Sequence, residues 1–289
     1  MRLITVSESE AGSRLDHFLA RRLSQAPKSF FYKMMRKKNI TLNGARCAGS
    51  ERLAAGDEIR LFLAEETIEK FSRPELVPVR QTKLDVIYED DHVALINKPA
   101  GMLSQRAGKD DVSLVEFLIA HLLEEGRVNA SSLREFSPSV CNRLDRNTSG
   151  IVLAGCSLKG LQILSEAVRE RTIGKYYLCV VKGAVTGPQE IAGWLVKDAR
   201  SNRVTIAEKE LPEGLPIRTR YLPLFCDGRL TVLEVELITG RSHQIRAHLA
   251  SIGHPVAGDP KYGDPALNRK LKETAGVCGQ LLHAWRLVM

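Results

Sequence analysis

The order of short apolar segments in residues 84–249 limits the fold more than any other feature of the chain. Strand-like segments are joined by hairpin-like turns, and only two amphipathic helical patterns interrupt them. A parallel α/β sheet needs a helix between successive strands, so this order excludes regular βαβ alternation. We therefore predict an α+β fold with a mixed, mostly antiparallel sheet. The expected strands are 85–88, 93–97, 151–155, 175–181, 218–225 and 230–238, and the expected helices are 113–123 and 158–174, with a loop at 124–139.

Residues 1–63 predict a separate, small α+β module. Apolar residues recur at helical spacing over about 14–24, and Pro27 opens a second helical pattern. Asn43-Gly44 predicts a tight turn between short strands, and an apolar strand closes the module at 56–63. This order resembles the alpha-L RNA-binding module of a small-subunit ribosomal protein. Residues 64–82 show no sustained periodicity and are predicted to be a linker, so that a second domain spans 83–289.

Basic residues are concentrated in the N-terminal module. Residues 1–63 contain 12 Lys and Arg against 6 Asp and Glu, a net charge of +6 within a total of +8 for the 289 residues. We interpret this asymmetry as a binding surface for a polyanion, in preference to a solvated basic face. The residues expected to bind RNA are Arg14, Lys33, Arg36, Lys37, Lys38 and Arg46.

The six cysteines are scattered, without a C-x-x-C pair or a histidine at zinc-ligand spacing. This distribution indicates reduced thiols rather than disulfides or a metal site. No signal peptide follows Met1, and no uncharged segment has the length needed to cross a bilayer. We expect a cytoplasmic monomer that does not bind membranes or metal.

One carboxylate stands between two guanidinium groups in Arg143-Leu144-Asp145-Arg146. Cations beside a carboxylate favour its ionised form, and arginines also bind phosphate, which suggests chemistry on a nucleic acid. On local sequence alone, a surface turn with a local salt bridge is the simpler interpretation. The remaining motifs have to distinguish the two.

Three other kinds of chemistry are poorly supported by the sequence. A zinc site formed by His243 and His248 is rejected, because residues five apart on a helix diverge by about 140° around its axis. Ser149 lacks the G-x-S-x-G context of a serine hydrolase. A glycosidase would need Asp259 as a second carboxylate, but its Gly-Asp-Pro context indicates a structural turn.

Four motifs, in the expected order over residues 84–286, resemble those of the RluA-type pseudouridine synthases. They correspond to the family's Arg-Leu-Asp signature, its Lys-x-Tyr strand, its third motif and a short motif near the start of the catalytic domain. The segments are 142–150, 175–183, 240–249 with 253–255 and 258–259, and Lys98-Pro99-Ala100-Gly101. Two departures are visible: Asn142 replaces the signature's histidine, and the chain stops at Met289, which leads us to expect a shortened last strand.

The resemblance implies an isomerase that converts uridine in RNA to pseudouridine without a cofactor. It assigns Asp145 as nucleophile or base on the ribose, Tyr177 as the aromatic residue that stacks on the target base, and Arg246 as the charge partner of Asp145. Arg143 is expected to fill the space left by the flipped-out uridine. Further substrate contacts are expected from Leu144, Lys98, Arg241, His243, Gln244 and Ile245.

The motifs leave the target RNA open. Large-subunit ribosomal RNA is favoured because of the N-terminal module, and transfer RNA is the alternative. A ribosome-assembly factor that binds RNA without catalysis would be marked by loss of Asp145, Tyr177 or Arg246, and all three are present. A nucleosidase, the weaker rival, would release free uracil.

Overall fold

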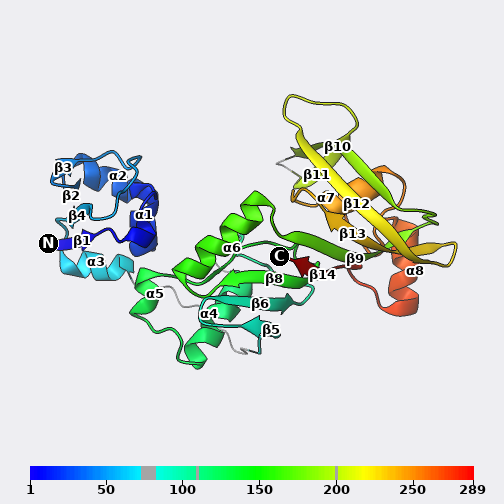
Figure 1. The fold of residues 1–289 in the computed structure, drawn as a ribbon, viewed down its shortest axis with the longest axis horizontal. Helices are drawn as coiled ribbons and strands as arrows, with labels where there is room; N and C mark the ends of the chain where they lie inside the picture. Colours follow the sequence, from blue (N-terminus) through cyan, green and yellow to red (C-terminus); the bar gives the residue numbers. More distant parts are fainter. Residues whose placement is uncertain (73–82, 109–110, 199–200) are drawn as a thin grey trace.

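The computed structural model describes residues 1–72, 83–108, 111–198 and 201–289. Its strands form two sheets, a small one near the N-terminus and a large one in the rest of the chain (Figure 1). With one exception, neighbouring strands in the large sheet are antiparallel, and helices pack on both of its faces. The predicted α+β class with a mostly antiparallel sheet is confirmed.

The N-terminal module contains a sheet with the strand order β1-β4-β2-β3. Its elements are β1 (Arg2–Thr5), the 3₁₀ helix η1 (Glu8–Glu10), α1 (Leu15–Arg22), α2 (Lys28–Arg36), β2 (Ile40–Leu42), β3 (Ala45–Arg46) and β4 (Glu58–Leu61). Phe18 of α1 and Phe31 of α2 are buried in a core separate from that of the large sheet. Asn43 and Gly44 have φ angles of 50° and 76°, as the predicted two-residue hairpin turn requires.

The segment after this module differs from the predicted linker. Residues Glu65–Ser72 form helix α3, and Ile68 is buried in the core of the N-terminal module. The prediction of an aperiodic linker is therefore wrong for this part, because Ile68 and Phe71 supply apolar contacts that dock a short helix on an existing core. The remainder of the predicted linker, residues 73–82, lies outside the described residues.

The large sheet has the strand order β11-β10-β12-β13-β9-β14-β8-β6-β5, and β7 also pairs with β8. The strands are β5 (Val86–Glu89), β6 (Val93–Lys98), β7 (Ser139–Val140), β8 (Ser149–Gly155), β9 (Gly174–Lys182), β10 (Gln189–Asp198), β11 (Arg203–Ala207), β12 (Leu215–Cys226), β13 (Leu230–Leu237) and β14 (Leu282–Val288). The one parallel pair is β14 with β8. This pair brings the end of the chain to the centre of the sheet (Figure 1).

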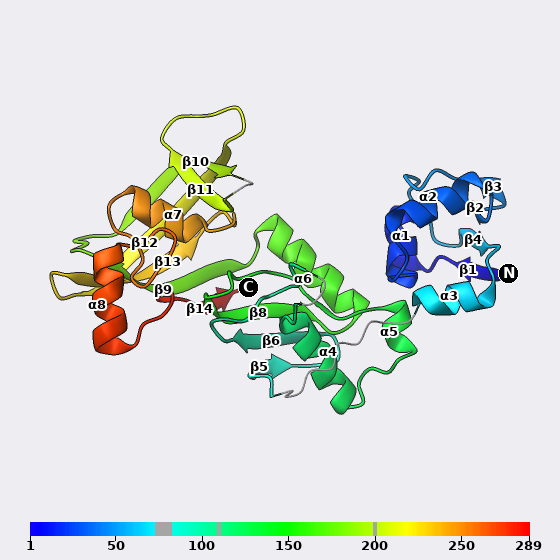
Figure 2. The ribbon, with the colours of Figure 1, turned by 180° about the vertical axis from the view of Figure 1, so that it is seen from behind.

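Helices cover the two faces of the large sheet differently. They are α4 (Leu114–Glu124), α5 (Ser132–Glu135), α6 (Leu158–Glu170), α7 (Gln244–Ser251) and α8 (Pro265–Ala275). Leu118 of α4 and Ile245 of α7 share one core with Tyr177 of β9, whereas Leu164 of α6 belongs to a different cluster with Leu153 of β8. Figure 2 shows α7 against β10, β11 and β12. Helix α5 interrupts the predicted loop at 124–139 with a single turn.

Gly150 explains how β14 reaches its place beside β8. Its φ angle is 112°, and a Cβ atom at this position would overlap the backbone of Ala284 in β14. A side chain here would therefore push the two strands apart. The Thr-Ser-Gly end of the first motif is a packing requirement of the sheet centre.

The structure bears on the state of the cysteines and on the presence of membrane-spanning helices. All six cysteines are free thiols. No helix in the described part of the chain combines the length and apolar character needed to cross a membrane.

His248 of α7 is a buried titratable group that should make stability depend on pH. It is 2% exposed, and its Nδ1 lies 3.0 Å from the Thr219 hydroxyl. Burial lowers its pKa from 6.5 to about 4, against a smaller opposing effect of the Ala192 backbone. Between these values the unfolded chain binds a proton that the folded protein does not, so stability is present above pH 6.5 and is lost as pH falls toward 4.

We expect that His248→Gln flattens this acid limb, which amounts to about 3 kcal/mol in wild-type protein. The measurement is urea unfolding at half-unit pH intervals from 4 to 8. His17→Gln, at an exposed position on α1, is the matched control and should keep the wild-type slope. Equal slopes in wild-type and His248→Gln protein would contradict the prediction.

Candidate active site

The loop that carries Asp145 joins β7 to β8 and is held by hydrogen bonds from two sides. The Ser104 hydroxyl accepts a hydrogen bond from the Leu144 amide (3.0 Å) and donates one to the Leu144 carbonyl (2.9 Å). Asn142 accepts a hydrogen bond from the Leu153 amide of β8 at 2.7 Å, so the residue in place of the signature's histidine ties the loop to the sheet. The Asp145 side chain remains 26% exposed and can meet a substrate.

Arg246 of α7 binds two carboxylates at once. Its Nη1 donates to Asp145 Oδ2 at 2.7 Å, and its Nε and Nη2 donate to Asp259 at 2.7 and 2.8 Å. The Arg246 side chain is 5% exposed, and that of Asp259 is fully buried. Within the described residues, Arg143 and Arg146 form no ion pair, so the local salt bridge considered from the sequence does not form.

Asp259 is the anchor of this arrangement. Burial acts to raise the pKa of Asp259, but hydrogen bonds from Arg246 and from the Lys261 and Tyr262 amides lower it below its usual value. Burial likewise acts to lower the pKa of Arg246, and the two carboxylates outweigh it and raise the pKa. Both groups are therefore charged, and their bidentate geometry compensates the cost of burying them.

The sequence indicates only a structural turn at Asp259. The Gly-Asp-Pro context gives no sign of the ion pair with Arg246, because Asp is common in such turns whether or not its carboxylate has a further partner. The available signal is indirect: an arginine on the buried face of a helix needs a carboxylate, and Asp259 is 13 residues away from Arg246.

Tyr177 lies in the middle of β9, next to the strands β13 and β14. It is 6% exposed and belongs to the same core as Leu144 and Ile245. Burial and the negative charge of Asp145 raise the pKa of Tyr177, so its hydroxyl keeps its proton. This hydroxyl makes no hydrogen bond to a described residue and is available to a bound base.

His243 precedes the first residue of α7 and has a left-handed backbone, with φ 55° and ψ 13°. Its Nδ1 lies 2.9 Å from the Tyr262 hydroxyl, and its Nε2 lies 3.9 Å from Asp145 Oδ1. Burial lowers the pKa of His243 below its usual value of 6.5, so the ring is neutral at pH 7. The structure thus brings His243, Arg246 and Asp145 together, as the site requires.

Lys98 is buried, and its ammonium group is committed to backbone carbonyls, so its contacts do not support the expected substrate contact. It is 0% exposed, and its ammonium group donates to the carbonyls of Pro99, Met102 and Arg146 at 3.0, 2.8 and 3.1 Å. Burial lowers the pKa of Lys98 to about 8, against the opposing effect of the Asp145 charge. Its role is to fasten the turn after β6 to the loop that carries Asp145.

The Gln244 amide is also committed to the protein itself, so its contacts do not support the expected substrate contact. Its Oε1 accepts hydrogen bonds from the Thr239 hydroxyl and the Arg241 amide, at 2.8 and 3.1 Å. Its Nε2 donates to the Arg218 carbonyl and the Thr219 hydroxyl, at 3.0 and 3.1 Å. With every donor and acceptor of the amide used, Gln244 positions the start of α7 against β12.

The other expected contact residues divide into two groups. Arg143 and Arg241 are exposed and form no ion pair with any residue the structure describes, so their guanidinium groups can meet phosphate. Leu144 and Ile245 are 7% and 4% exposed and pack in the core with Tyr177. Leu144 and Ile245 therefore belong to the apolar core next to Tyr177.

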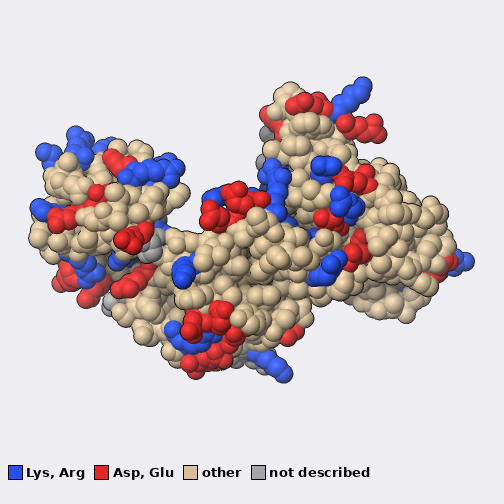
Figure 3. Space-filling view, viewed as in Figure 1, with Lys and Arg blue, Asp and Glu red and all other residues tan. Residues whose placement is uncertain are grey.

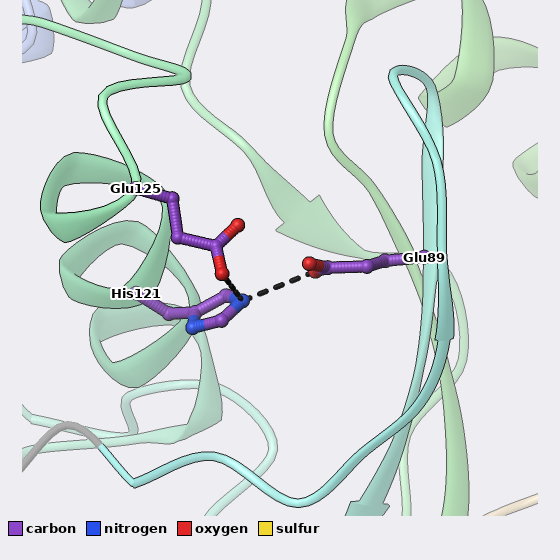
Figure 4. Close-up of side chains that lie close together, drawn as sticks. All are labelled: Glu89, His121 and Glu125. Atoms are coloured by element: carbon purple, nitrogen blue, oxygen red, sulfur yellow. Dashed lines mark hydrogen bonds and ion pairs between the residues drawn. The ribbon is translucent and has the colours of Figure 1, made fainter.

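A further group of titratable side chains lies between β5 and the end of α4 (Figure 4). His121 Nε2 is 3.1 Å from Glu89 Oε2 and 3.6 Å from Glu125 Oε1. The ligand atoms of the three residues lie within 4.8 Å of one another, a spacing that could hold a metal ion. However, Arg127 Nη1 is 3.2 Å from Glu89 Oε2 and already supplies a cation. We interpret the group as an ion-pair network that joins β5 to α4.

The chain is similar in sequence to known proteins. Residues 92–251, which are 160 of the 289, match the family model described as RNA pseudouridylate synthase. The chain is 32% identical over 288 residues to the ribosomal large subunit pseudouridine synthase C of Escherichia coli K12, covering 98% of this chain and 87% of that one. It is 33% identical to the protein of the same name from Haemophilus ducreyi, covering 98% and 86%.

Solved structures of low sequence identity share the fold. Human RNA pseudouridylate synthase domain containing 1 superposes with a TM-score of 0.56 at 21% identity, over 73% of this chain and 80% of that one. Human RNA pseudouridylate synthase domain containing 4 gives 0.57 at 19% identity, over 71% and 83%. The chain belongs to the RNA pseudouridylate synthase family. It is an isomerase that converts uridine in RNA to pseudouridine.

Proposed function

We propose that this enzyme modifies specific uridines of large-subunit ribosomal RNA in the cytoplasm, acting as a monomer without a metal or organic cofactor. The names of the similar bacterial proteins support ribosomal RNA over transfer RNA. One observation supports the proposed site most directly. Asp145 contacts the buried Arg246, which Asp259 holds in place.

The chemistry assigned to these residues follows from their positions. The reaction breaks the N1–C1′ bond of uridine and joins C5 to C1′. Asp145 acts either as a nucleophile at C1′ or as a base on the ribose; in both cases Oδ1 is the reacting oxygen, because Oδ2 is bound by Arg246. Tyr177 meets the detached base with its ring, and its hydroxyl, which keeps its proton, can donate a hydrogen bond to the base.

The target base must leave its stack to reach Asp145, which is only partly exposed. Arg143 lies two residues before Asp145, is exposed and has no ion-pair partner in the described part of the chain. We assign it to the space that the flipped uridine leaves in the RNA. Arg241, also exposed, is assigned to a neighbouring phosphate.

The N-terminal module is assigned to RNA binding outside the active site. Lys33, Arg36, Lys37 and Lys38 are exposed on α2 and just after it, and within the described residues none of them forms an ion pair. Figure 3 shows Lys and Arg side chains gathered on the side of the module where α2 lies. Arg46 is exposed on β3, whereas Arg14 is paired with Asp16 at 2.9 Å and contributes less.

Replacing Lys33, Arg36, Lys37 and Lys38 by Gln should weaken binding to structured RNA and lower its salt dependence. The slope of log affinity against log salt should fall by about 0.9 for each phosphate that the variant no longer neutralises, up to about 3 to 4 in all. Fluorescence anisotropy from 50 to 300 mM salt measures this slope. Lys159→Gln with Arg169→Gln on α6 is the control and should keep it. An unchanged slope in the fourfold variant would count against the module.

The proposed target is tested by mapping pseudouridines in RNA from cells that lack this protein. We expect sites to disappear from large-subunit ribosomal RNA and to return when wild-type protein is supplied. If pseudouridines disappeared from transfer RNA alone, the target would be transfer RNA and not ribosomal RNA. Free uracil in place of pseudouridine, in RNA treated with the purified protein, would contradict isomerisation.

A further inference from the structure

The two oxygens of Asp145 have different surroundings. Oδ2 is bound by Arg246 at 2.7 Å, whereas Oδ1 faces His243 Nε2 at 3.9 Å. This separation is too long for a direct hydrogen bond. The separation fits one oxygen atom that is hydrogen-bonded to both groups. If this oxygen lies about 2.8 Å from each group, the angle between the two hydrogen bonds is about 90°.

The contacts of Tyr262 favour one tautomer of His243. The Tyr262 hydroxyl accepts a hydrogen bond from the Val204 amide at 2.9 Å and lies 2.9 Å from His243 Nδ1. The amide can only donate, so the acceptor in reach of the hydroxyl proton is Nδ1. A neutral His243 that accepts at Nδ1 must carry its proton on Nε2, which faces Asp145.

The charges around His243 agree with a neutral ring. Burial lowers its pKa most; the carboxylate of Asp145 acts in the opposite direction, as does that of Asp259, and the cations Arg246 and Lys261 lower it further. The ring also contacts Tyr262 edge to face, with centroids 5.7 Å apart.

The backbone of His243 is left-handed at this position. Its φ of 55° is uncommon for a residue other than Gly, although His adopts it more often than most residues, and such conformations persist where the surrounding structure enforces them. The neighbouring Gln244 and Arg246 provide that enforcement through their buried hydrogen bonds. This backbone conformation places the imidazole beside the Asp145 carboxylate instead of in solvent.

We propose that Asp145 Oδ1 and His243 Nε2–H together bind the 2′-hydroxyl of the target ribose, with Tyr262 as a positioning residue. The hydroxyl donates a hydrogen bond to Asp145 Oδ1 and accepts one from His243 Nε2–H. In a uridine whose C1′ lies against Asp145, this hydroxyl is on the adjacent carbon and is the nearest of the sugar's hydroxyls. The 2′-hydroxyl is also the group that distinguishes RNA from DNA. The inference rests on the proposed catalytic role of Asp145.

The test uses an RNA oligonucleotide that spans a uridine mapped as a target, made with either uridine or 2′-deoxyuridine at that position. Wild-type enzyme should convert the uridine form at least about tenfold faster. His243→Phe should slow the uridine form by about 10- to 100-fold and leave the deoxy form nearly unchanged, so that the ratio approaches one. His254→Phe is the control and should keep the wild-type ratio.

Two further measurements separate this role from a structural one. With ¹⁵N-labelled histidine, the His243 signal should report the Nε2–H tautomer in wild-type protein and lose that signature in Tyr262→Phe. The same variant should lower the ratio of the two rates while the affinity for RNA stays unchanged, and it provides the test if His243→Phe does not fold.

A wild-type Nδ1–H tautomer, or a rate ratio in the variants equal to that of wild type, would overturn the inference while the proposed function stands. Absence of turnover by wild-type enzyme on the uridine oligonucleotide would overturn the proposed role of this site, and the inference with it.

Discussion

Asp145→Asn protein should bind RNA as tightly as wild type and form no pseudouridine. Asn has nearly the same shape but is neither a nucleophile nor a base at this position. The fold should persist, because Arg246 stays paired with Asp259 through two hydrogen bonds. We expect turnover to fall by about 10⁴-fold or more, the scale on which the loss of a catalytic group acts.

The measurement is tritium release from RNA labelled at C5 of uridine, with affinity measured on the same RNA. Asp91→Asn is the matched control, because Asp91 is exposed in the turn between β5 and β6 and should not affect turnover. Residual turnover within tenfold of wild type would remove Asp145 from the mechanism.

Asp259→Ala should damage both stability and catalysis. It leaves Nε and Nη2 of a guanidinium group that is 5% exposed without their acceptor. Breaking a buried charge pair in this way costs about 3–5 kcal/mol of unfolding free energy. Turnover should also fall at temperatures where the variant is folded, because Arg246 is no longer held against Asp145.

Urea unfolding and the tritium assay measure the two effects. The matched control is Asp264→Ala, which removes the N-cap of α8 in the same segment and should cost about 1 kcal/mol without slowing turnover. An Asp259→Ala protein within about 1 kcal/mol of wild type would mean that Arg246 does not depend on this anchor.

Local sequence patterns predicted the elements with an apolar periodicity of their own. The two helices of the N-terminal module, the helices α4 and α6 and the strands β8, β9, β12 and β13 all lie within a few residues of their predicted positions. Helix α8 was not predicted because it has no buried residue, and so no apolar stripe marks it. Its local signals are the capping residue Asp264 and Pro265 in the first turn.

The residues that form the site could be predicted from the sequence only when all the motifs were considered together. The local pattern around Asp145 favours Arg143 and Arg146 as its partners. The partner in the structure is Arg246, 101 residues away. A contact over that distance depends on the register of strands and on the docking of α7, which neighbouring residues do not encode.

The sequence by itself determined the fold class, the order of the motifs and the identity of the carboxylate at their centre. The tertiary structure alone decided which polar side chains of the motifs are bound by other groups of the protein. Lys98 and Gln244, like Asp145 and Arg246, belong to the four family motifs, yet they are saturated by hydrogen bonds to the protein. Conversely, Asp259, which the sequence shows as a turn residue, orients Arg246, and Tyr262, which no motif includes, contacts His243. The reason is physical: a residue type limits what a side chain can bind, but burial and the neighbours contributed by distant elements decide what it does bind.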